Sequence, residues 1–198
     1  MILYKNVDLS DLERILQRGI LSLDESENDN WKNSKRASNR TDVVYLFSPL
    51  TEQNSFTQYG AALIECECDG IQNDLLPNDV NNGLYKEYII DRVCPDQIRA
   101  IYVPEMFRER VKDLSPLVLG RITFCEMTAD IYDDAIEGDE KDFFGHPISG
   151  GWRRATENEL LRFAQTAPLN TWQLNYFRGE HENREVFDLK NIVYQIAG

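Results

Sequence analysis

The sequence predicts an α+β protein with a split, mixed or antiparallel β-sheet and few short helices. Strand-like runs of β-branched and aromatic residues are spread over the chain, helical periodicity is confined to short stretches, and long polar segments separate them. The chain has 198 residues and 42% hydrophobic content, which is enough to bury a core. We therefore expect a core of residues 1–115 and a C-terminal extension, residues 116–198, packed on the same domain.

The first expected elements are a strand from Ile2 to Lys5 and a short helix. Ser10 and Glu13 have the S-x-x-E spacing of a capping box, and the apolar residues that follow lie on one helical face. Gly19 is expected to end this helix, because glycine adopts the left-handed conformation that turns the chain back toward the core.

A polar stretch without periodicity follows, from residue 22 to residue 42. A connection of this length inside a compact domain usually binds something or is disordered. Arg36 and Arg40 lie near its end, and a continuous apolar strand from Val43 to Phe47 comes next.

The segment from Ala62 to Cys68 alternates between apolar and acidic residues, as a half-exposed strand does. Its apolar face holds Ile64, Cys66 and Cys68, and its polar face holds Glu65 and Glu67. A polar connection of residues 69–83 follows.

Residues 85–104, YKEYIIDRVCPDQIRAIYVP, predict two strands joined by a turn. Pro95 cannot donate to a strand ladder, so the break belongs at the turn, and Pro104 ends the second strand. Glu87 then lies near the start of the first strand, either as a solvated carboxylate or as a functional group.

The C-terminal half predicts one or two helical turns at residues 105–111 and a strand at residues 121–127. Residues 130–142 contain seven acidic residues and one lysine, which favours a solvated, partly disordered loop. Calcium binding is the alternative, but the EF-hand spacing is missing. Residues 143–151 are expected to be a glycine-rich link.

A helix is expected at residues 157–165, with Thr156 and Glu159 at its start. Strands at residues 186–189 and 192–196 complete the chain.

The net charge of −13 disfavours a phosphate-tracking surface, because its field repels nucleic acid and anionic membranes. No apolar run approaches the roughly 18 residues of a membrane span. We expect a soluble, cytoplasmic protein.

The four cysteines, Cys66, Cys68, Cys94 and Cys125, lack the paired spacing of a zinc site, so we expect free, buried thiols and no metal. Both histidines, His146 and His181, lie in polar or glycine-rich stretches and are expected at the surface.

The order of these motifs resembles the ADP-ribosyltransferase fold, and most closely the DarT-like enzymes. In that group an L-Y-H strand is followed by a helix and a G-[IL]-[LI]-S turn, and a late glutamate precedes a V-P-x-x-I-x-x-I element. The matching stretches here are Leu3-Tyr4-Lys5, Gly19-Ile20-Leu21-Ser22, Glu87, Val93-Cys94-Pro95 and Ile98-Arg99-Ala100-Ile101. The resemblance covers residues 2–104.

The resemblance implies NAD as a substrate and Glu87 as the catalytic carboxylate. Such a carboxylate stabilises the positive charge that develops on the ribose as the nicotinamide bond breaks. The resemblance further implies that Tyr85 or Tyr59 stacks on nicotinamide, and that Arg36 or Arg40 contacts the pyrophosphate or acts in transfer. Tyr4 and Lys5 stand where the family anchors NAD, and the loop of residues 22–42 would cover it.

This chain also departs from the family pattern. Lys5 and Asn6 replace the usual anchoring histidine, and a lysine cannot reproduce the directional donor of an imidazole. The segment Ser48-Pro49-Leu50-Thr51 lacks an arginine that the DarT-like enzymes carry. Those enzymes modify DNA, whereas the charge of this chain favours a protein or small-molecule acceptor.

A non-catalytic acidic interaction module on the same fold is the alternative function. Residues 116–198 would then supply the docking surface, with large aromatic side chains as anchors. These aromatic residues are Trp152, Trp172, Tyr176 and Phe177.

Overall fold

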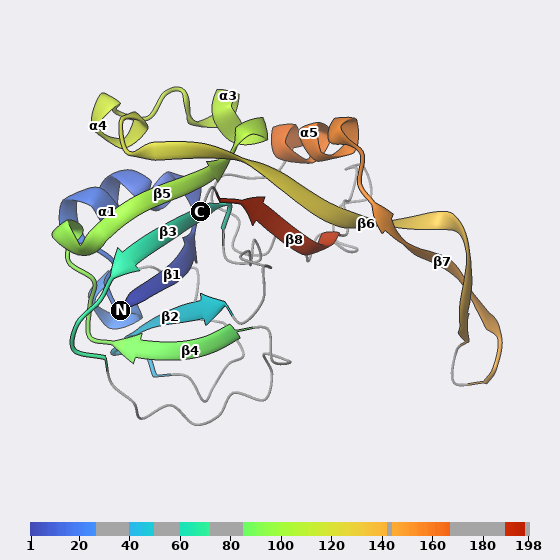
Figure 1. Ribbon diagram of the computed structural model, residues 1–198, viewed down its shortest axis with the longest axis horizontal. Coiled ribbons are helices and arrows are strands. Elements are labelled where there is room, and N and C mark those ends of the chain that lie inside the picture. The colour runs from blue at the N-terminus through green and yellow to red at the C-terminus, as the bar shows by residue number, and fades with distance from the viewer. Residues whose placement is uncertain (27–39, 50–59, 72–84, 142–143, 167–188, 197–198) are drawn as a thin grey trace.

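The computed structural model describes residues 1–26, 40–49, 60–71, 85–141, 144–166 and 189–196 (Figure 1). The strands are β1 (Ile2–Val7), β2 (Val44–Pro49), β3 (Ala62–Glu67), β4 (Tyr85–Ile90), β5 (Ile98–Pro104), β6 (Ile122–Lys141), β7 (Pro147–Arg154) and β8 (Leu189–Gln195). The helices are α1 (Leu12–Arg18), α2 (Leu23–Ser26), α3 (Arg108–Val111), α4 (Pro116–Leu119) and α5 (Glu157–Thr166), with 3₁₀ turns η1 (Leu9–Asp11), η5 (Pro95–Gln97) and η6 (Glu105–Phe107).

The strands form one mixed sheet in the order β4-β2-β1-β3-β5-β6-β7, and β8 pairs with β6. Only the β5–β6 pair is parallel among the described strands. The α+β class with few short helices is therefore confirmed. Strand β6 belongs to the expected C-terminal extension and joins the same sheet as the N-terminal strands.

The join between β1 and β2 is narrow. A single register pair, Tyr4 with Phe47, connects these two strands, whereas β1 and β3 pair along six residues each. Since β2 and β4 also pair along six residues each, the sheet has its weakest backbone connection between β2 and β1.

The predicted capping box at Ser10 and Glu13 is wrong. Ser10 lies in η1, and the helix begins at Leu12 after Asp11, which makes no side-chain capping bond. Glu13 instead accepts a hydrogen bond from the backbone amide of Ser115 at 2.7 Å. The carboxylate is therefore used to hold the start of α4, a partner 102 residues away in the chain.

Gly19 ends α1, as predicted. Its φ of 83° is in the left-handed region, and a Cβ at this position would lie 2.0 Å from the carbonyl oxygen of Val93. Ile20 then pairs with Val93 through two backbone hydrogen bonds of 2.9 Å. This close approach fixes the end of α1 against the segment that follows β4.

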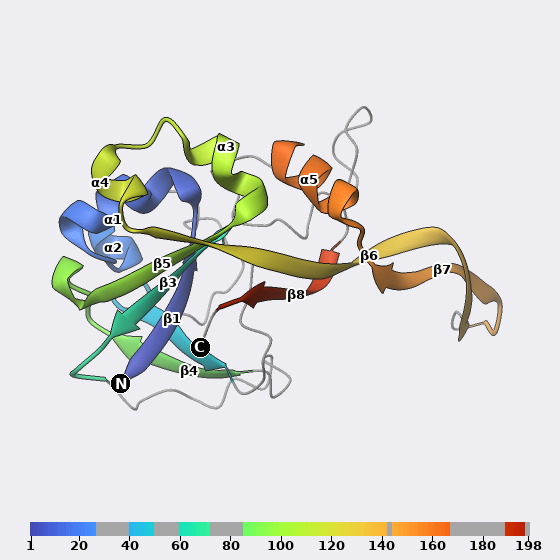
Figure 2. The same cartoon turned by 45° about the horizontal axis from the view of Figure 1, so that its top comes forward.

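Residues 130–141 of the acidic segment and residues 147–151 of the glycine-rich link are strands, where a loop over residues 130–142 and a link over residues 143–151 were expected. Strand β6 continues to Lys141 and pairs with β7 from Asp130 onward, while β8 pairs with its earlier part. Figures 1 and 2 show the β6–β7 hairpin extending as an arm from the rest of the molecule. Backbone pairing, which the side-chain composition does not reveal, holds this segment extended.

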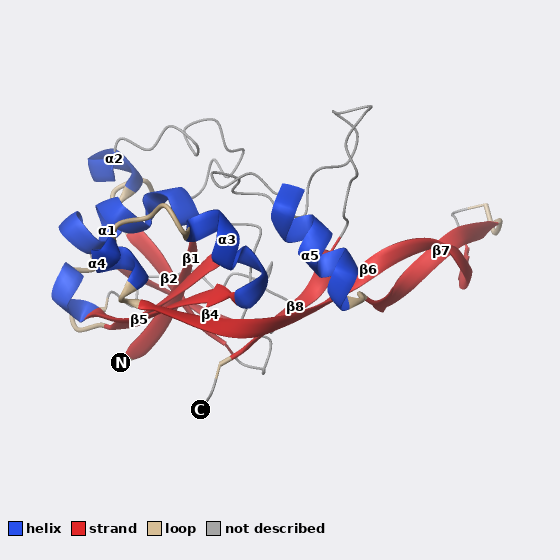
Figure 3. Cartoon of the chain, turned by 90° about the horizontal axis from the view of Figure 1, so that it is seen from above, coloured by secondary structure: helices blue, strands red, loops and turns tan. Residues whose placement is uncertain are grey.

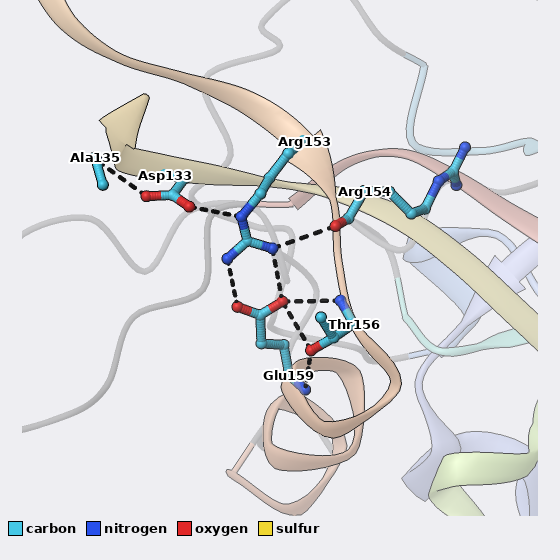
Figure 4. Close-up of polar contacts among 6 residues, drawn as sticks. All are labelled: Asp133, Ala135, Arg153, Arg154, Thr156 and Glu159. Carbon is cyan, nitrogen blue, oxygen red and sulfur yellow. Dashed lines mark hydrogen bonds and ion pairs between the residues drawn. The ribbon is translucent and has the colours of Figure 1, made fainter. Parts of the chain in front are cut away.

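The base of the arm is tied to α5 by Arg153 (Figure 4). Its guanidinium donates to Asp133 at 2.6 Å and to both carboxylate oxygens of Glu159 at 2.7 and 3.0 Å. Glu159 also accepts from the Thr156 backbone amide at 2.8 Å, and the Glu159 amide donates to Thr156 Oγ1 at 3.3 Å. The predicted helix start at Thr156 and Glu159 is therefore confirmed, and these two residues form a capping box that also anchors the arm.

The helices α1, α3, α4 and α5 are separate short pieces on the sheet, as Figure 3 shows. The ring of Phe107 in η6 meets Phe163 of α5 edge-on, with the ring centroids 6.1 Å apart. Apolar residues from β1, β3 and β5 are almost completely buried in the same core: Leu3, Leu63, Ile64, Ile101 and Val103.

Two smaller expectations also need correction. Cys94 is exposed, although Cys66, Cys68 and Cys125 are free and buried as expected. The polar stretch after Ser22 begins with the short helix α2, and the Glu25 amide donates to Ser22 Oγ at 3.3 Å. His146 is exposed, as predicted, whereas His181 lies outside the described residues.

No helix in the described ranges is long and apolar enough to cross a membrane.

Candidate functional site

Glu87 and Tyr4 lie on either side of Phe47 in the sheet. Tyr4 is opposite Phe47 in the β1–β2 pair, and Phe47 is opposite Glu87 in the β2–β4 pair. Residues directly opposite each other in antiparallel strands project from the same face. The rings of Tyr4 and Phe47 are 6.1 Å apart between centroids, which agrees with this placement. The sheet thus brings together two predicted site residues that are 83 positions apart.

Lys5 is held at the narrow join between β1 and β2. Its Nζ donates to the Tyr45 carbonyl oxygen of β2 at 3.0 Å. Burial lowers the pKa of Lys5 below its ordinary value, and the negative charge of Glu87 opposes this shift. The charge of Glu87 therefore favours the protonated form of Lys5.

A second carboxylate, Glu65, lies on the other side of Tyr4. Its Oε2 accepts from the hydroxyl of Tyr4 at 3.4 Å and from the hydroxyl of Tyr102 at 3.1 Å. Burial, followed by the charge of Glu65, raises the pKa of Tyr102 to about 12 and also raises that of Tyr4. Both hydroxyls therefore keep their protons near neutral pH and act as donors.

Arg40 is exposed and binds a neighbouring carboxylate. Its Nε and Nη2 donate to Asp42 at 2.9 and 2.7 Å, and its backbone amide donates to the Tyr45 hydroxyl at 2.8 Å. The guanidinium is thus directed toward Asp42, so contact with a bound dinucleotide would require it to change partner.

Three further predicted site residues, Tyr85, Arg36 and Tyr59, add little to the geometry of the site. Tyr85 is the first residue of β4, paired in register with Pro49. Arg36 and Tyr59 lie outside the described residues.

Sequence reasoning placed Glu65 on the exposed face of its strand but did not assign it to a site, and it missed Tyr102. The alternation of residues 62–68 was the only signal for Glu65. Its tyrosine partners are 61 and 37 positions away, so only the order of β1, β3 and β5 brings the three together.

These residues form a row across the sheet, from Glu87 through Phe47 and Tyr4 to Glu65 and Tyr102, which we call the central row. Two carboxylates flank an aromatic pair, an arrangement suited to binding groups with positive charge or hydroxyl donors. Within the described ranges, no group of three or more His, Cys, Asp and Glu side chains is placed to hold a metal ion.

Comparison of this chain with protein families, curated proteins and solved structures finds no match.

Proposed function

We propose that this protein is an NAD-dependent ADP-ribosyltransferase, or an NAD glycohydrolase, that modifies a protein or small-molecule acceptor. The proposal includes an ADP-ribosyltransferase-like split sheet as the core. The observation that carries it is the placement of Tyr4 and Glu87 on either side of Phe47, on one face of the sheet. It supports the proposal because the sequence resemblance assigned the NAD anchor and the catalytic carboxylate to these two positions.

In the proposed reaction, the bond between the ribose C1′ and the nicotinamide nitrogen breaks, and its electron pair leaves with nicotinamide. The carboxylate of Glu87 stabilises the positive charge that develops on the ribose and holds a ribose hydroxyl. The acceptor, or water in the glycohydrolase, then forms the new bond to C1′ and releases a proton to solvent.

The other residues have supporting roles in this proposal. Lys5 binds the dinucleotide from β1 after exchanging the Tyr45 carbonyl for it, and the ring of Tyr4 borders the site. Tyr59 or Tyr85 stacks on nicotinamide, while Arg36 or Arg40 contacts the pyrophosphate or acts in transfer. Because Arg40 binds Asp42, it would have to exchange this carboxylate for the substrate.

The test is calorimetric titration of the full chain with NAD, together with an assay of nicotinamide release, in the wild type and in Glu87→Gln. We expect binding in both proteins and a loss of release in the variant of about 100-fold or more, as when one transition-state electrostatic contact is removed. Glu67→Gln is the matched control, because Glu67 is an exposed carboxylate on β3 that pairs with Arg99.

Two results would contradict the proposal. The first is no detectable binding at millimolar NAD, and the second is equal nicotinamide release by the wild type and Glu87→Gln.

The arm favours a second candidate function, docking of a basic protein. Phe144 is 79% exposed and Trp152 is 37% exposed, and residues 130–142 are strongly acidic. A polylysine peptide serves as the probe, and Phe144→Ala is expected to weaken its binding. Leu117→Ala is the control, because Leu117 is 62% exposed on α4, outside the arm. Equal binding by the two variants would count against this function.

A further inference from the structure

The carboxylate of Glu65 is fixed by two tyrosines from the strands on either side of it. Tyr4 of β1 and Tyr102 of β5 both donate to the same oxygen, Oε2. Figure 1 shows β1, β3 and β5 side by side. All three side chains are half-buried, so the carboxylate is held in one place with access from outside.

Glu65 carries a negative charge that no side chain compensates within the described ranges. Its only hydrogen bonds there are those from the two tyrosines, both to Oε2, and it forms no ion pair. Glu67, two residues further along the same strand, pairs with Arg99 through two hydrogen bonds. A partly desolvated carboxylate without a counter-charge is unfavourable, so Glu65 is suited to receive a cation from another molecule.

The surroundings favour a planar cation. The ring of Tyr4 and the adjacent ring of Phe47 lie on one side of Glu65, and Tyr102 lies on the other. A guanidinium group stacks on aromatic rings and donates two parallel hydrogen bonds to one carboxylate. A divalent metal ion needs several oxygen ligands, whereas this position has one carboxylate.

We propose that Glu65, Tyr4 and Tyr102 form a guanidinium-binding subsite that anchors an arginine side chain of a protein partner. The net charge of −13 would attract a basic partner to the protein, and Glu65 offers its arginine a fixed carboxylate. The subsite does not require the proposed NAD chemistry, since binding of the arginine involves no covalent step.

The experiment is a titration of the ¹⁵N-labelled full chain with N-acetyl-arginine methylamide, without NAD, followed by NMR. We expect saturable shifts at the amides of Tyr4, Glu65 and Tyr102, with a dissociation constant on the order of 1 mM, which corresponds to about 4 kcal/mol. The lysine and citrulline analogues should bind at least several-fold more weakly, because one lacks the planar fork and the other lacks the charge.

Glu65→Gln should weaken binding of the arginine probe by about 10-fold or more, since it removes a charge-assisted bidentate contact. Tyr102→Phe frees the carboxylate on one side and should weaken binding a few-fold. The matched control, Glu67→Gln on the same strand, should bind as the wild type does.

The proposal is overturned if the arginine probe does not bind, if citrulline binds equally, or if Glu65→Gln and Glu67→Gln behave alike. Thermal unfolding of each variant checks that it is folded. If Glu65→Gln does not fold, Tyr102→Phe still tests the subsite. Failure of NAD binding would leave this result unaffected, so the two proposals are tested separately.

Discussion

Asp8, directly after β1, is a deeply buried carboxyl group with a missing partner. Its side chain is 6% exposed, and its Oδ1 has no hydrogen-bond partner in the described part of the chain. Burial, followed by the negative charge of Asp11, raises the pKa of Asp8 to about 7. The folded protein therefore binds this proton more tightly than the unfolded chain does.

This raised pKa gives a prediction about stability and pH. The folded state holds the proton while the unfolded chain loses it near pH 4, so the stabilisation present at low pH is lost as the pH rises to about 7. Asp8→Asn has no such ionisation, and at pH 8 it should be more stable than the wild type by on the order of 2 kcal/mol. Urea denaturation at pH 4 and pH 8 measures the difference.

The control is Asp113→Asn, which removes an exposed carboxylate and should leave the pH dependence unchanged. If the wild type and Asp8→Asn lose stability in parallel between pH 4 and pH 8, the Asp8 carboxyl does not cause the pH dependence of stability.

At the scale of the elements, two sequence motifs with the same capping-box spacing have different structures. Thr156 and Glu159 form the capping box of α5, whereas Ser10 and Glu13 have the same spacing without forming one. Thr156→Ala should therefore destabilise the protein by about 1 kcal/mol, the usual cost of losing an N-cap. Ser10→Ala should stay within about 0.5 kcal/mol of the wild type, as exposed substitutions usually do.

Urea denaturation of both variants, at a pH where Glu159 is ionised, gives the two values. The Arg153 guanidinium holds the pKa of Glu159 at about 2, so any pH above 5 is suitable. Equal destabilisation by the two substitutions would show that the motif, and not the observed hydrogen bonding, determines the cost.

At the scale of the whole molecule, the C-terminal strand is tied back to the N-terminal half. Tyr194 of β8 is 1% exposed, and its hydroxyl donates to the Ala61 carbonyl oxygen, next to β3, at 2.6 Å. Burial keeps the pKa of this hydroxyl well above its ordinary value, so it remains a donor. This buried contact joins the extension to the core across 133 positions of sequence.

Tyr194→Phe leaves the Ala61 carbonyl buried without this donor, and the expected loss is about 1–3 kcal/mol. Thermal or urea unfolding should show one transition at a lower midpoint, because β6 joins both halves in one sheet. Tyr45→Phe is the control and should change stability little, since within the described part of the chain the Tyr45 hydroxyl accepts only from the exposed backbone amide of Arg40. Two separate transitions in Tyr194→Phe would contradict the single sheet.

Much of the fold was predictable where the signal is local in the chain. The alternation of residues 62–68, the turn at Pro95, the left-handed Gly19 and the cap of α5 all correspond to observed features. Each has a sequence signal that lies within a few residues of the feature it predicts. The capping box at Ser10 was wrong because Glu13 has a distant competitor, the amide of Ser115.

Of the candidate site, the sequence suggested Glu87, Tyr4 and Lys5 one by one, through a family resemblance. It could not show that Tyr4 and Glu87 flank Phe47, because that depends on which strands are neighbours. The Glu65 cluster was missed for the same reason.

The sequence by itself determined the α+β class, most of the strands and the ends of two helices, because side-chain periodicity and capping act over short distances. Only the tertiary structure decided that an acidic segment becomes the arm and that Glu65 lies between two tyrosines. Both outcomes depend on pairing between strands that are distant in the chain, and composition does not encode which strand becomes the neighbour.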